Sequence, residues 1–181
     1  MRLLLALAGV LTLAACGGTE TVTTTRTVTE TTTETITETE TVVEPAAVGL
    51  SEPVADTHAA LLEAAESGDY EALRPLIPAQ FSYTFGGPVQ GGPIAFWKRV
   101  EQESGERPIE ILARILRMPY TLSRGTYVWP FAYDKQADEL TDHEREILGD
   151  LAETFLPDTG YLGWRAGIEP DGTWSFFIAG D

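Results

Sequence analysis

Cysteine, histidine and basic residues are scarce in this chain of 181 residues. The single cysteine excludes an intramolecular disulfide and a thiolate metal cluster, and two histidines are too few for a histidine-rich metal site. Twelve lysines and arginines stand against 28 acidic residues, which gives a formal charge of −16. Binding to nucleic acid needs a basic face that displaces counterions from phosphate, so we expect no nucleic-acid partner.

Long apolar runs are also lacking, except for Leu3 to Leu13, which follows Arg2. As a helix this run would extend roughly 16 Å, too short for a hydrocarbon core of about 30 Å. A basic residue followed by a short apolar core is typical of a secretory signal peptide. We therefore predict that residues 1–15 form a signal peptide.

The apolar run ends in Leu13-Ala14-Ala15-Cys16-Gly17, which resembles the lipobox of bacterial lipoproteins. All four motif positions fit, and the only cysteine of the chain occupies the reactive one. The resemblance implies a diacylglyceryl thioether on Cys16, cleavage before that residue, and acylation of the new amine by a fatty acid such as palmitate. It thus implies a protein anchored in the lipid bilayer of the cell membrane, facing the outside or the periplasm.

A low-complexity segment follows, from Thr19 to Glu44. It holds 14 threonines, six glutamates, five valines or isoleucines and one arginine. The alternation in residues 35–42 would suit a strand, but neither face would be apolar enough to offset the entropy lost on ordering. We therefore predict that residues 16–52 are the lipidated cysteine and a disordered Thr/Glu-rich tether. Threonine-rich segments are also typical sites of O-glycosylation.

All tryptophans, tyrosines and phenylalanines lie at or after Tyr70, which places a globular domain in residues 53–181. Apolar spacing and capping residues predict helices over 55–67, 69–73, 93–104, 108–118 and 142–156. Strand patterns occur at 81–85, 126–131, 161–168 and 173–178. Without βαβ spacing, the predicted class is α+β, an antiparallel sheet packed against several short helices.

The C-terminal strands are predicted to form a hairpin, because Glu169-Pro170-Asp171-Gly172 is a turn sequence. Strict alternation would place Trp174, Phe176 and Ile178 on one face. We expect Trp174 to belong to the core, since large aromatic side chains supply the greatest buried area.

The chain lacks the Gly-x-Ser-x-Gly, P-loop and His-Glu-x-x-His motifs, and no cofactor or metal is predicted. A weaker signal comes from the aromatic run 129–133, where Pro130 suggests the edge of the sheet. We predict that Trp129 and Tyr133 line a ligand site, with polar contacts from Asp134 and Arg165.

Two classes of function remain open. The missing motifs favour a non-enzymatic module that binds a small ligand or an envelope protein. The alternative is an acid–base enzyme with His58 or Asp134 as the proton carrier. His58 falls on the apolar face of the first predicted helix, where we expect a hydrogen-bonded core histidine. The acids between Lys135 and Asp158 lack the spacing of a calcium-binding loop and repeat as a solvated helix face does.

The order of two short helices, a strand, a helix and a late antiparallel hairpin resembles the nuclear transport factor 2-like α+β cone. Within it, Ser67-Gly68-Asp69-Tyr70-Glu71-Ala72-Leu73 is similar to the turn between helices common in that family. The resemblance covers residues 55–105 and 160–178, and the helices predicted at 108–118 and 142–156 depart from it. The family includes enzymes and non-catalytic pocket modules, so the resemblance implies a pocket and leaves activity open.

The lipobox predicts that the mature chain begins at a lipidated Cys16. Mass spectrometry of the membrane fraction should find an N-terminal peptide from Cys16 that carries two or three acyl chains, because one chain alone anchors only marginally. The matched Cys16→Ser chain should carry no acyl mass. Recovery of an unmodified Cys16 from that fraction would contradict the prediction.

Overall fold

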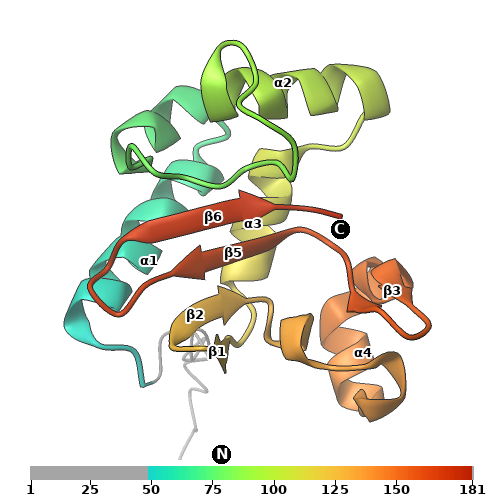
Figure 1. Ribbon diagram of the computed structural model, residues 1–181. Helices are drawn as coiled ribbons and strands as arrows, with labels where there is room; N and C mark the ends of the chain where they lie inside the picture. Colours follow the sequence, from blue (N-terminus) through green and yellow to red (C-terminus); the bar gives the residue numbers. More distant parts are fainter. Residues whose placement is uncertain (1–48, 181) are drawn as a thin grey trace, which may run out of the picture. The chain divides into compact units, whose positions relative to one another are not determined.

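The computed structural model describes residues 49–180 (Figure 1). The predicted signal peptide, Cys16 and the tether up to residue 48 lie outside the described residues. The α-helices of the described part are α1 (Glu52–Glu66), α2 (Gly92–Ser104), α3 (Pro108–Leu116) and α4 (Asp142–Leu148). Short 3₁₀ helices are η2 (Tyr70–Leu76), η3 (Phe131–Asp134), η4 (Ala137–Glu139) and η5 (Gly149–Thr154).

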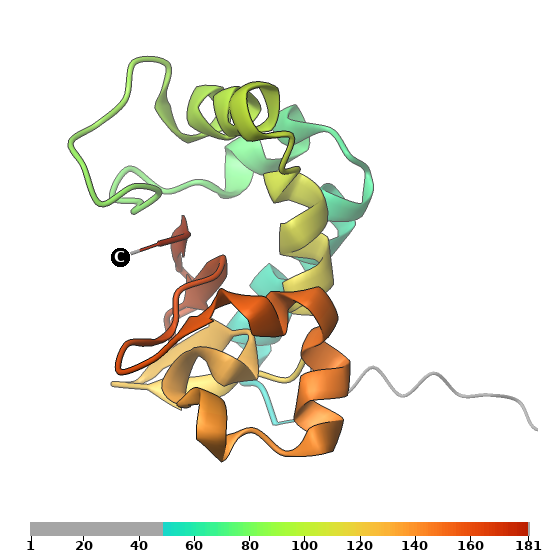
Figure 2. The same cartoon turned by 90° about the vertical axis from the view of Figure 1, so that its right-hand side faces the viewer.

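The strands form two antiparallel sheets. The larger has the order β1 (Thr121–Ser123), β2 (Thr126–Trp129), β5 (Arg165–Ile168) and β6 (Trp174–Ile178). The smaller pairs β3 (Phe155–Leu156) with β4 (Gly160–Tyr161). Helices α1 and α3 lie on one side of the larger sheet (Figure 1 and Figure 2), and α2 lies beside β6. The fold class is therefore α+β, an antiparallel sheet packed with helices.

The helix starts follow the capping chemistry of the sequence. Thr141 and Glu144 form a reciprocal capping box at α4, and Asp69 accepts a hydrogen bond from the backbone N–H of Glu71 at the start of η2. Gly149 divides the helix predicted over 142–156 into α4 and η5. Its φ of 57° and ψ of −129° belong to a conformation that glycine adopts readily and other residues do not.

The core centres on Trp97 of α2, which is fully buried. Its ring lies 5.9 Å from the ring of Trp174 and 5.4 Å from that of Phe177, measured between centroids. Phe81 packs against both tryptophans, at 6.0 Å from Trp97 and 4.5 Å from Trp174. Trp174 is 1% exposed, which confirms its predicted place in the core.

The predicted alternation along β6 is wrong, because the ladder between β5 and β6 shifts between Gly167 and Ile168. This bulge puts Trp174 and Phe177, three residues apart, on the same core-facing side. Phe176 faces the other way and lies across Gly167, where an added Cβ would come within 2.1 Å of the ring. A side chain at position 167 would therefore force the ring of Phe176 to move.

The strand predicted over 81–85 is also wrong. Ser82 forms only an isolated parallel bridge to Phe176, and the chain then turns away. The Tyr83 hydroxyl accepts a hydrogen bond from the backbone N–H of Val89 at 2.8 Å, which closes the glycine-rich loop. One of the strands on which the nuclear transport factor 2-like resemblance depended is thus replaced by a loop.

The folded part begins earlier than the predicted boundary at residue 53. Leu50 packs against the core, and α1 starts at Glu52 with Pro53 in its first turn. Gly49 already lies beside the domain, since a Cβ there would be 3.2 Å from the Tyr120 hydroxyl. The last residues of the predicted tether therefore belong to the domain.

A chain that begins at Gly49 should unfold cooperatively, with the same free energy of unfolding as the chain that begins at Gly17. A chain that begins at Pro53 should lose about 1–2 kcal/mol, because it lacks the contact of Leu50 and the charge of Glu52 at the helix N-terminus. Urea titration followed by circular dichroism measures both values. Equal stability of the chains that begin at 49 and 53 would show that Leu50 contributes nothing.

Candidate functional site

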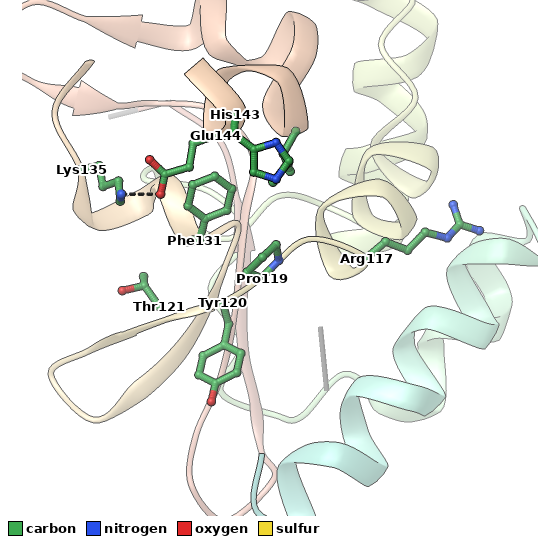
Figure 3. A pocket seen from close by; sticks show the side chains of 9 residues that line it. Arg117, Pro119, Tyr120, Thr121, Phe131, Lys135, His143 and Glu144 are labelled. Carbon is green, nitrogen blue, oxygen red and sulfur yellow. Dashed lines mark hydrogen bonds and ion pairs between the residues drawn. The ribbon is translucent and has the colours of Figure 1, made fainter. Parts of the chain in front are cut away.

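A cavity of about 600 Å³ lies where the end of α3, the start of β1, η3 and α4 meet. We call it the Phe131 cavity, after the ring that forms its centre (Figure 3). Three separate segments, residues 117–121, 131–135 and 143–147, converge on it, and most of its surface is apolar. Its lining residues are Arg117, Pro119, Tyr120, Thr121, Phe131, Lys135, His143, Glu144 and Ile147.

The position of Phe131 is determined by the way in which strand β2 ends. Trp129 ends that strand and is fully buried, and its indole stacks on the imidazole of His58, with 5.1 Å between centroids. After Pro130 the chain enters η3, where the backbone N–H of Phe131 donates to the carbonyl of Pro119 at 2.8 Å. This hydrogen bond joins two lining segments and directs the Phe131 ring into the cavity.

The main polar feature of the cavity is the ion pair of Lys135 and Glu144, with Nζ and Oε1 2.6 Å apart. Both side chains are largely covered, at 31% and 23% exposure. The other oxygen of Glu144 accepts from the backbone N–H of Thr141 at 2.9 Å and from its hydroxyl at 3.1 Å. The hydrogen bond from Lys135, followed by that from Thr141, lowers the pKa of Glu144 to about 2.

The Lys135 ammonium also lies 5.9 Å from the centroid of the Phe131 ring. An ammonium over an aromatic face is attracted by the ring quadrupole. Lys135 is thus held between a carboxylate and an aromatic ring at the side of an apolar hollow (Figure 3). Figure 3 also shows Arg117 pointing away from Phe131, and its guanidinium pairs with Glu66 of α1 at 2.7 Å.

Of the residues predicted from the sequence, Tyr133 and Arg165 do come together. The Arg165 guanidinium carbon lies 5.6 Å from the ring centroid of Tyr133 and 5.4 Å from that of Phe85. Arg165 also donates to the carbonyls of Gly163 and Gly180, at 3.3 and 2.8 Å. Arg165 thus contacts the glycine-rich loop, η3 and the end of the chain and holds them together.

Trp129 and Asp134 do not join that cluster. Strand β2 lies between β1 and β5, so the inference of a sheet edge from Pro130 was wrong. The side chain of Trp129 faces the helices and is fully buried, whereas Asp134 is exposed at the end of η3. Phe131, two positions after Trp129, is the residue of this run that lines the cavity.

Neither histidine lies in the core beside an acidic side chain, as a buried general base would. His58 is 3% exposed, and its Nε2 lies 2.8 Å from the carbonyl oxygen of Leu116, so it is the hydrogen-bonded core histidine expected from the sequence. His143 is 80% exposed at the first turn of α4, with Nδ1 3.7 Å from a carboxylate oxygen of Glu146. Asp134 and His58 lie in different parts of the domain, one on its surface and one in its core.

A second cavity of about 620 Å³ lies beside β3. Its lining comes from only two segments, residues 136–138 and 155–158, and it is more polar than the Phe131 cavity. The two acids in it, Asp138 and Asp158, are both exposed. Convergence of three segments and an apolar centre make the Phe131 cavity the better candidate for a ligand site.

Comparisons with family models, curated proteins and solved structures find no match to this chain. Between residues 49 and 180, no helix has the length and hydropathy needed to cross a membrane. In the same range, no three His, Cys, Asp or Glu side chains form a group that could hold a metal ion.

The Lys135–Glu144 pair predicts a pH dependence of stability. Since the folded-state pKa of Glu144 lies near 2, below its ordinary value of 4.5, the pair stabilises the fold above pH 4.5, and this contribution is lost as the pH falls towards 2. Glu144→Gln should lower the melting temperature at pH 7 and reduce its fall between pH 4.5 and 2.

The matched control is Glu146→Gln on the same helix, where the side chain is 83% exposed. It should melt like the parent chain throughout this pH range. If Glu144→Gln and the control followed the same curve, the pair would make no contribution to stability.

Proposed function

We propose that this protein is a lipid-anchored lipoprotein of the bacterial cell envelope whose globular domain binds a small ligand in the Phe131 cavity. The lipobox that ends in Cys16 supports a lipid anchor and a location on the outer or periplasmic side of the cell membrane. The apolar cavity, with one ion pair in its wall, supports the binding activity. The cavity is the observation that carries the molecular function.

The size and lining of the cavity fit this role. Ligand sites in proteins have volumes of about 300–1,000 Å³ and combine apolar walls with a few polar groups that orient the ligand. Phe131, Pro119 and Ile147 supply the apolar wall, and Lys135 with Glu144 supplies the polar part. The Lys135–Glu144 pair links the end of η3 to the first turn of α4.

Binding without chemical change is favoured over acid–base catalysis by His58 or Asp134, because neither of these residues lines the Phe131 cavity. The imidazole of His58 is engaged with a backbone carbonyl inside the core, and Glu144 is engaged by a lysine and a helix cap. A general base has to be within hydrogen-bonding reach of a substrate proton and free to accept it. His58 has no such access, and the acceptor sites of Glu144 are largely used.

Binding can be tested with N-phenyl-1-naphthylamine, a neutral dye that fluoresces in apolar sites, and the chain that begins at Gly17 in lipid-free buffer. We expect enhanced fluorescence that falls at least fivefold in Ile147→Glu, which puts a charge into the apolar wall. Leu122→Glu is the control, because Leu122 is an exposed apolar residue outside the lining. Circular dichroism verifies the fold of both variants.

Equal fluorescence of Ile147→Glu and the parent chain would show that the dye, and hence a small apolar ligand, does not use this cavity. Loss of the signal in Leu122→Glu alone would move the binding surface to β1. Either result would overturn the proposed site.

A further inference from the structure

We propose that the Phe131 cavity selects small organic acids, with the ligand's carboxylate bound by Lys135 and its apolar body on Phe131 and Ile147. This proposal rests on the proposed function and adds the chemical class of the ligand. The observation that carries it is the position of one ammonium, fixed between a carboxylate and an aromatic ring, in the wall of an apolar hollow.

The hydrogen-bonding capacity of Lys135 points to an acceptor ligand. A lysine ammonium has three donors, and within the described residues one hydrogen bond of Lys135 is seen, to Glu144. Two donors are therefore left for a ligand in the cavity. Thr121, which also lines the cavity, adds a hydroxyl that can donate to the same acceptor.

Glu144 does not offer a matching site for a cation. Its carboxylate already accepts three hydrogen bonds, two from Thr141 and one from Lys135. The bonds from Thr141 belong to the capping box of α4, so the carboxylate cannot turn towards a ligand without uncapping the helix. Glu144 therefore acts as a positioning residue that holds the ammonium, while the ligand is recognised by donors.

The apolar wall determines the size and polarity of the rest of the ligand. A cavity of about 150 Å³ already holds a benzene-sized molecule, so the 600 Å³ here accommodate an acid with one or two rings or a branched chain. Phe131 is both the platform of the ammonium and part of this wall. The carboxylate and the ring of an arylacetic acid would therefore meet Lys135 and the wall at the same time.

The number of cations at the hollow favours a ligand with one carboxylate. In the lining, the second strong cation, Arg117, pairs with Glu66 and points away from Phe131. Lys135 is also paired, with Glu144, but its ammonium lies beside the Phe131 ring. With 28 acidic residues against 12 basic ones, the chain repels extended polyanions such as nucleic acid or an anionic membrane surface.

The test uses the full chain in lipid nanodiscs and three probes of one shape: 4-fluorophenylacetate, its neutral amide and 4-fluorophenethylammonium. Fluorine relaxation at pH 7 gives each Kd, with empty nanodiscs to correct for partition into lipid. We expect the acid to bind at least tenfold more tightly than the other two, because charge-assisted hydrogen bonds are the stronger kind.

Three lysine variants separate recognition from stability. Lys135→Met should weaken acid binding about tenfold or more and leave the amide unchanged, whereas Lys135→Arg, which keeps the donors, should stay within about threefold of the parent chain. Lys98→Met is the matched control. Lys98 pairs with Glu71 at 3.0 Å and lies 6.0 Å from the Tyr70 ring, the same chemistry outside the cavity lining.

Equal affinities for the acid and the amide, or unchanged acid binding in Lys135→Met, would overturn the proposal. Because N-phenyl-1-naphthylamine is neutral, its binding reports on the cavity independently of the acid. If the dye binds and the acid shows no preference, only the ligand class is wrong. If neither the dye nor any of the three probes binds, the proposed function fails as well.

Discussion

Burial of Trp129 at the end of β2 is the constraint on which the site depends. The indole is enclosed between His58 of α1 and Tyr120, whose ring centroid lies 5.5 Å away. Directly after this fixed residue, the chain leaves the sheet at Pro130 and enters η3. The hydrogen bond from Phe131 to the Pro119 carbonyl then fixes the next ring in the cavity. A contact in the core thus positions the ring that lines the cavity.

The same lysine–carboxylate pair has different consequences in the two places where it occurs. Between Lys98 and Glu71 the side chains are 44% and 48% exposed, and such surface pairs contribute about 0–1 kcal/mol because water screens them. Each lysine also lies about 6 Å from an aromatic ring, but between Lys135 and Glu144 the groups are more covered and are linked to a helix cap. There the pair orients an ammonium towards a hollow, which a solvated pair cannot do.

Some of the residues that the sequence suggests for a site come together in the structure and others do not, and particular residues show why. Tyr133 and Arg165 lie in contact. Pro130 suggests a sheet edge beside Trp129, but β1, a strand of three residues, covers that side of β2. The sequence does not mark Lys135 and Glu144 as a site. Their pattern is a capping box after an aromatic run, and an ordinary helix start shows the same pattern.

Local chemistry in the sequence was enough to predict the α+β class, most helices and the turn of the C-terminal hairpin, because these depend on neighbouring residues. Tertiary structure alone decided the bulge at Gly167, which side of the sheet each aromatic residue faces, and the convergence of residues 117–121, 131–135 and 143–147 on one cavity. A bulge changes the side-chain period by one residue, and the cavity forms only where three separate segments fold against one another. Neither leaves a periodic pattern in the sequence, so both emerge only when the core packs.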